Sequence, residues 1–360
     1  MNIHETYMHR CIELALLGSG RVAPNPMVGA LLVHDNRIIG EGYHENYGEA
    51  HAEVNCINSV SKEDIHLLEK STLYVSLEPC AHFGKTPPCA DLVIQKKIPQ
   101  VVIGCRDPFV EVNGKGMDKL MNAGIGVKQG ILEEECQALN KRFFVFHNRK
   151  RPYIILKWAQ TANGKIGNDD HSRLLISGDF TNRLVHKWRS EEQAILVGTN
   201  TALFDDPELT TRLWPGTHPI RLVVDMHLRL PGKLKLFSPG NTTIVFNLHQ
   251  HTLPLEKFSI TDIKNKGVFY YQLAEDSNLV HQLLNALHAL NIQSVLVEGG
   301  AFLLQSFIDE GAWDEARLIE NRELSINGGL PAPVLQNFIP GKTENYLPDV
   351  IRTFTNKQVY

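Results

Sequence analysis

The stretch STLYVSLEPCAHFGKTPPCADLVIQKKI (71–98) decides the fold of the first half of the chain. Its opening, STLYVSLEPC (71–80), has the length and the apolar, β-branched and aromatic composition of a buried strand. PPCADLVIQKKI (87–98) is predicted to be a helix, because proline suits the first helical turn. A strand that leads directly into a helix is one step of a layered α/β sheet.

The same alternation continues on both sides of this stretch. The spacing predicts strands at VGALLVHD (28–35), RIIGEGY (37–43) and VVIGC (101–105). It predicts a helix that begins at HAEVNCINSV (51–60), and an amphipathic helix near the N-terminus, where apolar residues recur at helical spacing. The first half is therefore expected to be one α/β domain.

The basic cluster KRFFVFHNRKRP (141–152) interrupts this pattern and is interpreted as a linker. We therefore predict two domains, residues 1–148 and residues 149–360. In the second domain the expected strands are YIILKWAQ (153–160), AILVGT (194–199), IRLVVD (220–225), TTIVFN (242–247), GVFYY (267–271) and SVLVEGG (294–300). Helices are expected at FTNRLVHKWRS (180–190) and SNLVHQLLNALHAL (277–290). The fold class is α/β in both halves.

Composition narrows the function. The formal net charge of the 360 residues is -4, so no basic surplus indicates a nucleic-acid partner, and a small-molecule ligand is expected. No apolar run has the roughly 20 residues of a membrane span, and the N-terminus is too polar and acidic for a signal peptide. All six cysteines lie in the first half, which favours metal binding or catalysis over a disulfide framework. We expect a reduced, cytoplasmic compartment.

The strongest motif is His51-Ala52-Glu53, followed by Pro79-Cys80 and by Cys89 nine residues after Cys80. This order of ligands is that of the zinc-deaminase signature H-x-E…P-C-x-x-C, except that the second cysteine here stands farther away, across the insert AHFGKTPP (81–88). One imidazole and two thiolates leave the fourth tetrahedral position of the metal open for water, whose pKa zinc lowers toward neutrality. Glu53 is then placed to carry a proton from the water to the ring nitrogen and the leaving amine. A structural zinc site would need a fourth protein ligand, for which His82 and Cys56 are the nearest candidates.

Three segments in and around this motif resemble a known protein family. PNPMVGALLV (24–33), GYHENYGEAHAEV (42–54) and LEPCAHFGKTPPCADLVI (77–94) resemble the deaminase half of the bifunctional riboflavin-biosynthesis deaminase/reductases. The resemblance implies a cytidine-deaminase-like, three-layer α/β/α domain with one Zn²⁺ per chain. It also implies a phosphorylated substrate, a diaminopyrimidinone that carries a phosphoribosylamino group and loses its ring amine. Asn25 and His44 would help to hold the pyrimidine.

The second half resembles the reductase of the same family. The matching segments are RPYIILKWAQTANGKIG (151–167), SGDFTNRLVHKWR (177–189), AILVGTNTALFDDPELTTR (194–212) and VEGGAFLLQSF (297–307). The resemblance implies a dihydrofolate-reductase-like α/β domain that uses NADPH. Hydride transfer to the open-chain, imine-like ribosyl group would give a ribitylamino product.

The resemblance also implies site residues in the second half. The NADPH contacts would be Gln160, Leu174, Thr201, Asp205, Gly300, Ala301, Phe302 and Leu303. The substrate contacts would be Ser172, Arg189, Leu209, Arg212 and Glu298, with Lys157 as the catalytic residue. Independently of the family, Gly299-Gly300 after a predicted strand and before a predicted helix suits a phosphate, because glycine amides approach closely. Arginines such as Arg189 and Arg212 bind phosphate in a bidentate manner.

The chain departs from the family pattern at several positions. In the first half, Phe109-Val110 replaces Asn-Pro, Ala50 replaces a proline and Lys85 replaces an arginine. In the second half, Asn163 replaces an aspartate, Thr161 a serine and Gln193 an aspartate, and the tail ENRELSINGGLPAPVL (320–335) lacks the usual ending.

Three hypotheses follow from the sequence. The first is a bifunctional deaminase and reductase, expected to form a homodimer, since symmetric dimers are common. The second is a nucleic-acid base deaminase, for which only the basic segment 141–152 argues. The third is a deaminase whose second domain has lost catalysis, which Asn163 and the altered tail suggest. Residues beyond about 320 are left unassigned.

Overall fold

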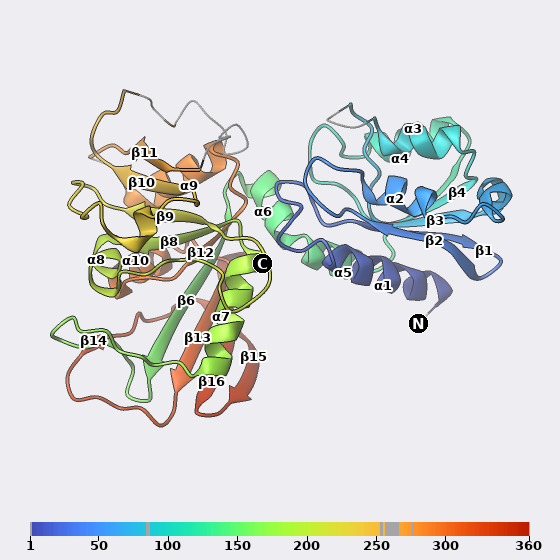
Figure 1. Ribbon diagram of the computed structural model, residues 1–360. Helices are drawn as coiled ribbons and strands as arrows, with labels where there is room; N and C mark the ends of the chain where they lie inside the picture. The colour runs from blue at the N-terminus through green and yellow to red at the C-terminus, as the bar shows by residue number, and fades with distance from the viewer. Residues whose placement is uncertain (1, 84–86, 253–254, 256–265, 276, 360) are drawn as a thin grey trace. The chain divides into compact units, whose positions relative to one another are not determined.

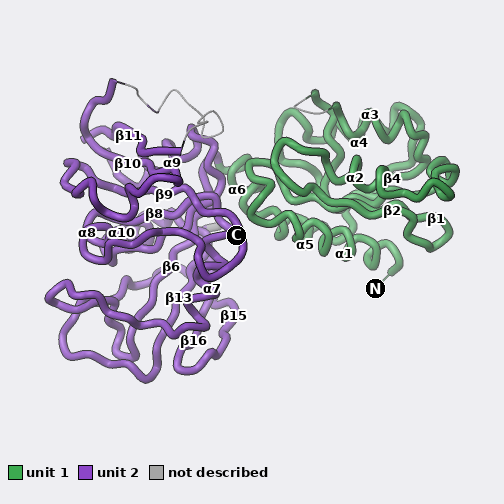
Figure 2. Tube along the Cα trace, viewed as in Figure 1, with its two compact units in different colours: residues 1–149 green, residues 150–360 purple. Residues whose placement is uncertain are grey.

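The structure is a computed structural model that describes residues 2–83, 87–252, 255, 266–275 and 277–359. The chain divides into two compact units, Met1–Arg149 (unit 1) and Lys150–Tyr360 (unit 2), shown in separate colours in Figure 2. Each unit has its own hydrophobic clusters. Among the described residues, no helix is both long and apolar enough to cross a membrane.

Unit 1 is a five-stranded sheet of order β2-β1-β3-β4-β5 (Figure 1). Its elements are α1 (Ile3–Leu16), β1 (Gly29–His34), β2 (Arg37–Tyr43), α2 (Ala52–Asn58), β3 (Thr72–Leu77), α3 (Cys89–Gln95), β4 (Gln100–Cys105), α4 (Lys115–Asn122), β5 (Gly126–Gln129), α5 (Glu133–Leu139) and α6 (Lys141–Arg149). Strand β1 pairs antiparallel with β2 and β3, whereas β3, β4 and β5 are parallel. The predicted strands and helices of 28–105 are confirmed.

Both faces of the sheet in unit 1 are buried. Leu31 and Val33 of β1 pack in one cluster with Met8 of α1, whereas Ala30 and Leu32 belong to the cluster on the opposite face. Helices α1 and α5 cover the first face, and α2, α3 and α4 the second (Figure 1). Burial on both sides explains why β1, β3 and β4 are largely apolar runs rather than alternating ones.

The interpretation of 141–152 as a linker is wrong for most of its length. Residues Lys141–Arg149 form helix α6. Phe143 and Phe146, three residues apart, are buried on one side of this helix. The helical spacing is concealed in the sequence, because Phe144 and Val145 lie between the two buried phenylalanines and make one continuous apolar run flanked by basic residues.

Unit 2 is built on a nine-stranded sheet of order β11-β10-β9-β8-β12-β6-β13-β16-β15. Its strands are β6 (Tyr153–Thr161), β7 (Lys165–Gly167), β8 (Ala194–Gly198), β9 (Ile220–Val224), β10 (Thr243–Asn247), β11 (Val268–Gln272), β12 (Ser294–Val297), β13 (Glu315–Asn321), β14 (Leu330–Pro331), β15 (Phe338–Tyr346) and β16 (Asp349–Asn356). Its helices are α7 (Asp179–Glu191), α8 (Thr199–Asp205), α9 (Leu279–Ala289) and α10 (Ala301–Asp309). The strands from β11 to β13 are parallel, and β16 and β15 extend them antiparallel.

The unassigned tail completes this sheet. Strand β16 pairs with the whole length of β13, and β15 pairs with β16 at the edge. Most of β15 is exposed, so its sequence FIPGKTENY lacks the apolar alternation that identifies a strand. The two short strands β14 and β7 pair separately and attach the segment after β13 to the turn after β6.

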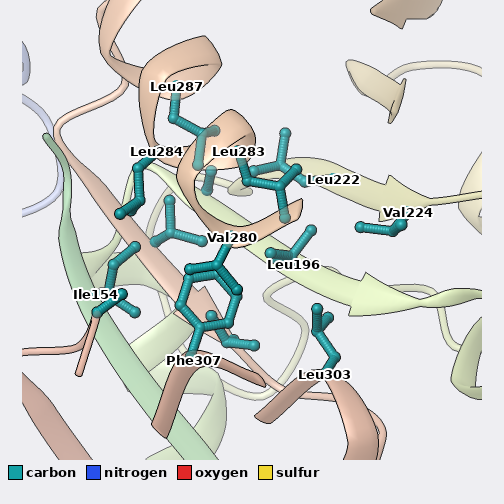
Figure 3. Packing of buried hydrophobic residues seen from close by; sticks show 14 of the residues in the cluster. Ile154, Leu196, Leu222, Val224, Val280, Leu283, Leu284, Leu287, Leu303 and Phe307 are labelled. Atoms are coloured by element: carbon teal, nitrogen blue, oxygen red, sulfur yellow. The ribbon is translucent and has the colours of Figure 1, made fainter. Parts of the chain in front are cut away.

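The main core of unit 2 lies where α9 and α10 pack against the parallel strands. Figure 3 shows Phe307 of α10 beside Val280 of α9 and close to Ile154 of β6. Phe307 is completely buried, whereas Phe302 on the same helix is 86% exposed. One helix therefore carries a buried and an exposed phenylalanine that can be compared directly.

We expect Phe307→Ala to lower the free energy of unfolding of unit 2 by about 3–5 kcal/mol, because it leaves a cavity in a packed core. Phe302→Ala should change it by no more than about 0.5 kcal/mol. All four tryptophans lie in unit 2, so urea unfolding followed by tryptophan fluorescence reports on this unit alone. Equal effects of the two substitutions would contradict the packing described here.

Candidate active sites

The three predicted metal ligands of unit 1 meet at the ends of three segments. His51 immediately precedes α2, Cys80 follows β3, and Cys89 begins α3. The Nδ1 atom of His51 lies 3.6 Å from the Cys80 Sγ and 3.4 Å from the Cys89 Sγ. One ligand atom from each of the three residues lies within 4.8 Å of the others. The residues thus form one compact group, as their order in the sequence predicts.

These distances fit zinc. Bonds of about 2.0 Å to nitrogen and about 2.3 Å to sulfur in a tetrahedral site separate the two ligand atoms by about 3.5 Å. The main-chain N–H of Cys89 also donates to the Cys80 Sγ at 3.3 Å, so the beginning of α3 stabilises a thiolate there. Within the described part of the chain, the group has three members, and neither His82 nor Cys56 joins it. A three-ligand site is the arrangement of a catalytic zinc.

The protonation of the two cysteines also favours a cation. Hydrogen bonding from the Cys89 thiol, with further help from His51, lowers the pKa of Cys80 to about 4. The pKa of Cys89 is raised, because the Cys80 thiolate lies beside it and the site is buried. A divalent cation relieves the repulsion between two adjacent thiolates, so this donor set suits a metal ion.

Glu53, Asn25 and His44 surround the metal group. Glu53 lies in the first turn of α2 with its carboxyl group buried near Cys89, and burial raises its pKa. His44 packs edge-on against His51, with 5.3 Å between ring centroids. Its Nδ1 lies 3.0 Å from the Ala50 carbonyl oxygen and its Nε2 lies 3.1 Å from the Asn25 amide nitrogen. A neutral His44 that donates to Ala50 and accepts from Asn25 satisfies both contacts.

The predicted residues around the metal are therefore brought together. The Ala50 departure leaves the contact with His44 in place, since this contact uses the Ala50 carbonyl group, which a proline also has. Gly84, Lys85 and Thr86 of the long insert between the two cysteines lie outside the described residues. Sequence reasoning missed Asn140, whose amide group bonds both main-chain groups of Met27 at 2.8 Å and so holds the segment next to Asn25.

In unit 2 a second cluster forms where parallel strands end. Val297 of β12 pairs with Leu156 of β6, so Glu298 and Lys157 follow at the same level of the sheet. The Glu298 Oε2 lies 3.7 Å from Lys157 Nζ. Arg189 of α7 donates to both carboxylate oxygens of Glu298, each at 2.8 Å. The Glu298 side chain is 5% exposed, so the cluster is a buried charge network.

Burial and ion pairing together set the pKa values of Glu298 and Lys157 in this cluster. Burial opposes ionisation of Glu298, but the charges of Arg189 and Lys157 outweigh it and lower the pKa of Glu298 to about 2. Burial lowers the pKa of Lys157, and the charge of Glu298 offsets this only in part. Lys157 is therefore a stronger proton donor than an exposed lysine.

The two arginines have different roles in the structure. Arg189 makes its bidentate contact with Glu298, and its side chain is only 13% exposed. Arg212 has a side chain 48% exposed and bonded to Glu208 at 2.9 Å. Its main-chain N–H donates to His186 Nδ1 at 2.9 Å, which fixes the position of this segment beside α7. Of the two, Arg212 is the more accessible to a phosphate.

Other predicted residues of unit 2 are placed more loosely. Thr201, in the first turn of α8, lies against the Gly299-Gly300 turn, where a Cβ at Gly299 would overlap its side chain. Gly300 has φ +72, a conformation that favours glycine, and precedes α10. Gln160 accepts from the Trp158 indole N–H at 3.0 Å. The structure leaves Asp205 and Ser172 exposed and Leu174 and Ala301 half-buried.

Two predicted side chains do not face a ligand. Leu209 is 2% exposed and belongs to the cluster beneath β8, β9 and β10, so only its main chain can contact a substrate. Leu303 is buried in the main core, whereas its neighbour Phe302 is exposed. The sequence resemblance identifies positions in a segment and does not tell side-chain contacts from main-chain contacts.

Asn163 forms hydrogen bonds with the unusual tail (320–335). The Asn163 Nδ2 donates to the Ile326 carbonyl oxygen at 2.8 Å, and the Oδ1 accepts from the Ile326 N–H at 3.4 Å. Gln193 repeats this pattern, since its amide accepts from the Gln293 N–H and donates to the Asn291 carbonyl oxygen. An ionised aspartate could only accept. At both positions, therefore, an amide that donates one hydrogen bond and accepts another takes the place of a carboxylate that can only accept.

Comparison with known proteins adds two family matches. Residues 1–105 match the cytidine and deoxycytidylate deaminase zinc-binding region, and residues 152–320 match the RibD C-terminal domain. The chain is 39% identical to riboflavin biosynthesis protein RibD from Aquifex aeolicus (strain VF5), over 87% of this chain and 85% of the relative. It is 38% identical to the RibD protein of Actinobacillus pleuropneumoniae, over 85% and 80% of the two chains.

A solved structure matches almost the whole length. It is the diaminohydroxyphosphoribosylaminopyrimidine deaminase/5-amino-6-(5-phosphoribosylamino)uracil reductase from Thermotoga maritima. The TM-score is 0.86 with 36% identity, and the match covers 98% of this chain and 99% of the other.

We expect the protein to bind about one zinc ion per chain. Cys80→Ser should reduce the zinc content at least tenfold, because it removes one of three protein ligands. Cys56→Ala should keep the zinc. It removes a buried thiol of α2, the helix that follows His51, but this thiol is outside the ligand group. Elemental analysis of dialysed protein measures both, and zinc retained by the Cys80 variant would contradict the ligand assignment.

Proposed function

The chain belongs to the RibD family of riboflavin biosynthesis proteins, and from this premise we propose that the zinc group of unit 1 and the Lys157–Glu298–Arg189 cluster of unit 2 are its two active centres. The protein is a bifunctional enzyme of riboflavin biosynthesis, a deaminase and a reductase, and its cofactors are Zn²⁺ and NADPH. We assign the deaminase to residues 1–148 and the reductase to residues 149–360. The two family matches, one in each compact unit, support this division.

In the deaminase, Asn25 and His44 orient the pyrimidine next to the metal group. When bound, zinc activates a water molecule as the nucleophile at the ring carbon that carries the amine. Glu53 accepts a proton from the nucleophile and delivers one to the ring nitrogen and then to the leaving amine. Its buried position beside Cys89 excludes bulk water from this transfer.

In the reductase, the substrate is the deaminated pyrimidine with its ribosyl group in the open-chain, imine-like form. When bound, NADPH supplies the hydride to the imine carbon. Lys157 Nζ supplies the proton to the imine nitrogen, so the product is the ribitylamino compound. Glu298 holds Lys157 in place, and Arg212 binds the phosphate. The register of β12 with β6, which sets Glu298 beside Lys157, is the observation that carries this assignment.

The alternatives are weaker in this structure. The basic segment that suggested a nucleic-acid channel is helix α6, whose Phe143 and Phe146 are buried and cannot stack on bases. The tail that suggested a lost reductase is bonded to the same unit through Asn163. A homodimer and a cytoplasmic location remain predictions. Six free cysteines are consistent with a reducing compartment.

The decisive experiment separates the two half-reactions. With the phosphoribosylamino diaminopyrimidine, the zinc-loaded enzyme should release ammonia and then oxidise NADPH. Glu53→Gln should lose ammonia release by at least about a hundredfold, yet reduce the deaminated intermediate at the wild-type rate. Lys157→Met should show the reverse. Ammonia release without NADPH oxidation by the wild-type enzyme would restrict the function to unit 1.

Asn163→Asp tests whether the tail supports the reductase. The aspartate cannot donate to Ile326, so the tail should be held less tightly on the turn after β6, although the β14–β7 pairing remains, and the KM for NADPH should rise several-fold. Deaminase activity should not change. Asn345→Asp, the same change on the exposed edge strand β15, is the matched control. A wild-type KM for the Asn163 variant, measured at saturating intermediate, would show that the tail does not affect the cofactor site.

A further inference from the structure

Glu78 is a buried carboxylate that the mechanism above does not use. It follows β3, two residues before the zinc ligand Cys80, and it is only 3% exposed. Its Oε2 accepts from the main-chain N–H groups of Gly114 at 2.9 Å and Asp107 at 3.3 Å. Its Oε1 accepts from those of Gly116 at 3.0 Å and Met117 at 3.2 Å. One side chain thus satisfies four amide groups of a single segment.

These contacts supply what the sequence of that segment lacks. Helix α4 begins after Gly114, which has no side chain to accept from the first-turn N–H groups. Unpaired N–H groups at a helix N-terminus are normally satisfied by a capping side chain of the preceding residue. Here Glu78, which follows β3 and is distant in the sequence, caps α4. Its negative charge suits the positive end of the helix.

The capped segment packs directly on the turn that carries the metal ligand. A Cβ at Gly116 would overlap the Pro79 carbonyl oxygen, so the beginning of α4 lies flat against Pro79-Cys80. The same segment carries Phe109, whose ring contacts His82 edge-on at 5.9 Å between centroids. Segment 107–117 therefore contacts the chain both just before Cys80, at Pro79, and just after it, at His82.

We propose that Glu78 is a positioning residue for deamination, which holds segment 107–117 against the Pro79-Cys80 turn and so fixes the placement of the Cys80 thiolate. This proposal rests on the zinc deaminase assigned to unit 1. Glu78 does not touch the substrate in this proposal. It acts through the four main-chain amides and through Gly116. Because the carboxylate is buried, its loss cannot be compensated by water.

Glu78→Gln tests the proposal with little change in size. The glutamine keeps one acceptor oxygen, but its NH₂ group faces main-chain N–H donors, so two of the four hydrogen bonds are lost. We expect deaminase kcat/KM to fall about ten- to a hundredfold, as for a small misplacement of a catalytic group. Reduction of the supplied intermediate by unit 2 should stay at the wild-type rate. Glu111→Gln makes the same charge change on an exposed residue of the same segment and should leave both activities unchanged.

Two readouts do not depend on activity. Hydrogen exchange of amides in 107–117 should be faster in the Glu78→Gln holoenzyme, with exchange in α1 unchanged. With Co²⁺ in place of zinc, the thiolate-to-metal absorption bands should shift while the metal content stays at about one per chain. Loss of the metal would overturn the proposal, since the role would then be metal retention, and so would wild-type kinetics with wild-type exchange.

A second variant covers failure of the first to fold. Glu78→Asp keeps the charge but is one methylene shorter, so it should give values of exchange and kcat/KM between those of the wild type and Glu78→Gln. Wild-type values for Glu78→Asp would contradict the proposal. If the wild-type enzyme itself released no ammonia, the proposed function would fail, whereas the exchange and cobalt spectra would still report whether Glu78 positions the segment.

Discussion

The parallel pairing of neighbouring strands is the constraint on which both sites depend. In unit 1, β3 and β4 run side by side, so the residues after Leu77 and those after Cys105 emerge at one edge of the sheet. In unit 2, the pairing of β12 with β6 places Glu298 beside Lys157. Ligands in open α/β sheets bind outside the carboxyl ends of the strands. Each half of this chain uses that edge, although the chemistry of the two halves differs.

Burial of charge is the second shared element. Glu78 is stabilised by main-chain N–H groups, whereas Glu298 is stabilised by Arg189 and Lys157. Both solutions meet the requirement that a buried carboxylate be hydrogen-bonded or paired. The two sets of partners have different consequences. Main-chain amides hold a segment of backbone in place but do not give a proton to a substrate. A paired lysine keeps a proton that can be delivered to a substrate.

Most of the fold and the metal group could be predicted from the sequence, because apolar runs and the spacing of His51, Cys80 and Cys89 are local signals. Helix α6 was missed, because residues 143–146 are one continuous apolar run between basic residues and show no helical spacing. Strand β15 was missed, because an exposed edge strand carries no apolar alternation. Glu78 and Asn140 were missed for another reason. Their partners lie many residues away, and no pattern in the sequence links a carboxylate to the amides of a distant segment.

The pairing of Asn163 with Ile326 has a consequence for building chimeras of this enzyme. The amide forms two hydrogen bonds with one residue of the tail, much as a neighbouring strand would. A turn (161–169) taken from a relative that has aspartate at position 163 would present to this tail a side chain able to accept but not to donate. Exchange of the turn alone would therefore leave the Ile326 carbonyl group without its donor, whereas exchange of both segments keeps each side chain with its own tail. Residues 161–169 and 322–335 form a single interchangeable part, although more than 150 residues of chain separate them.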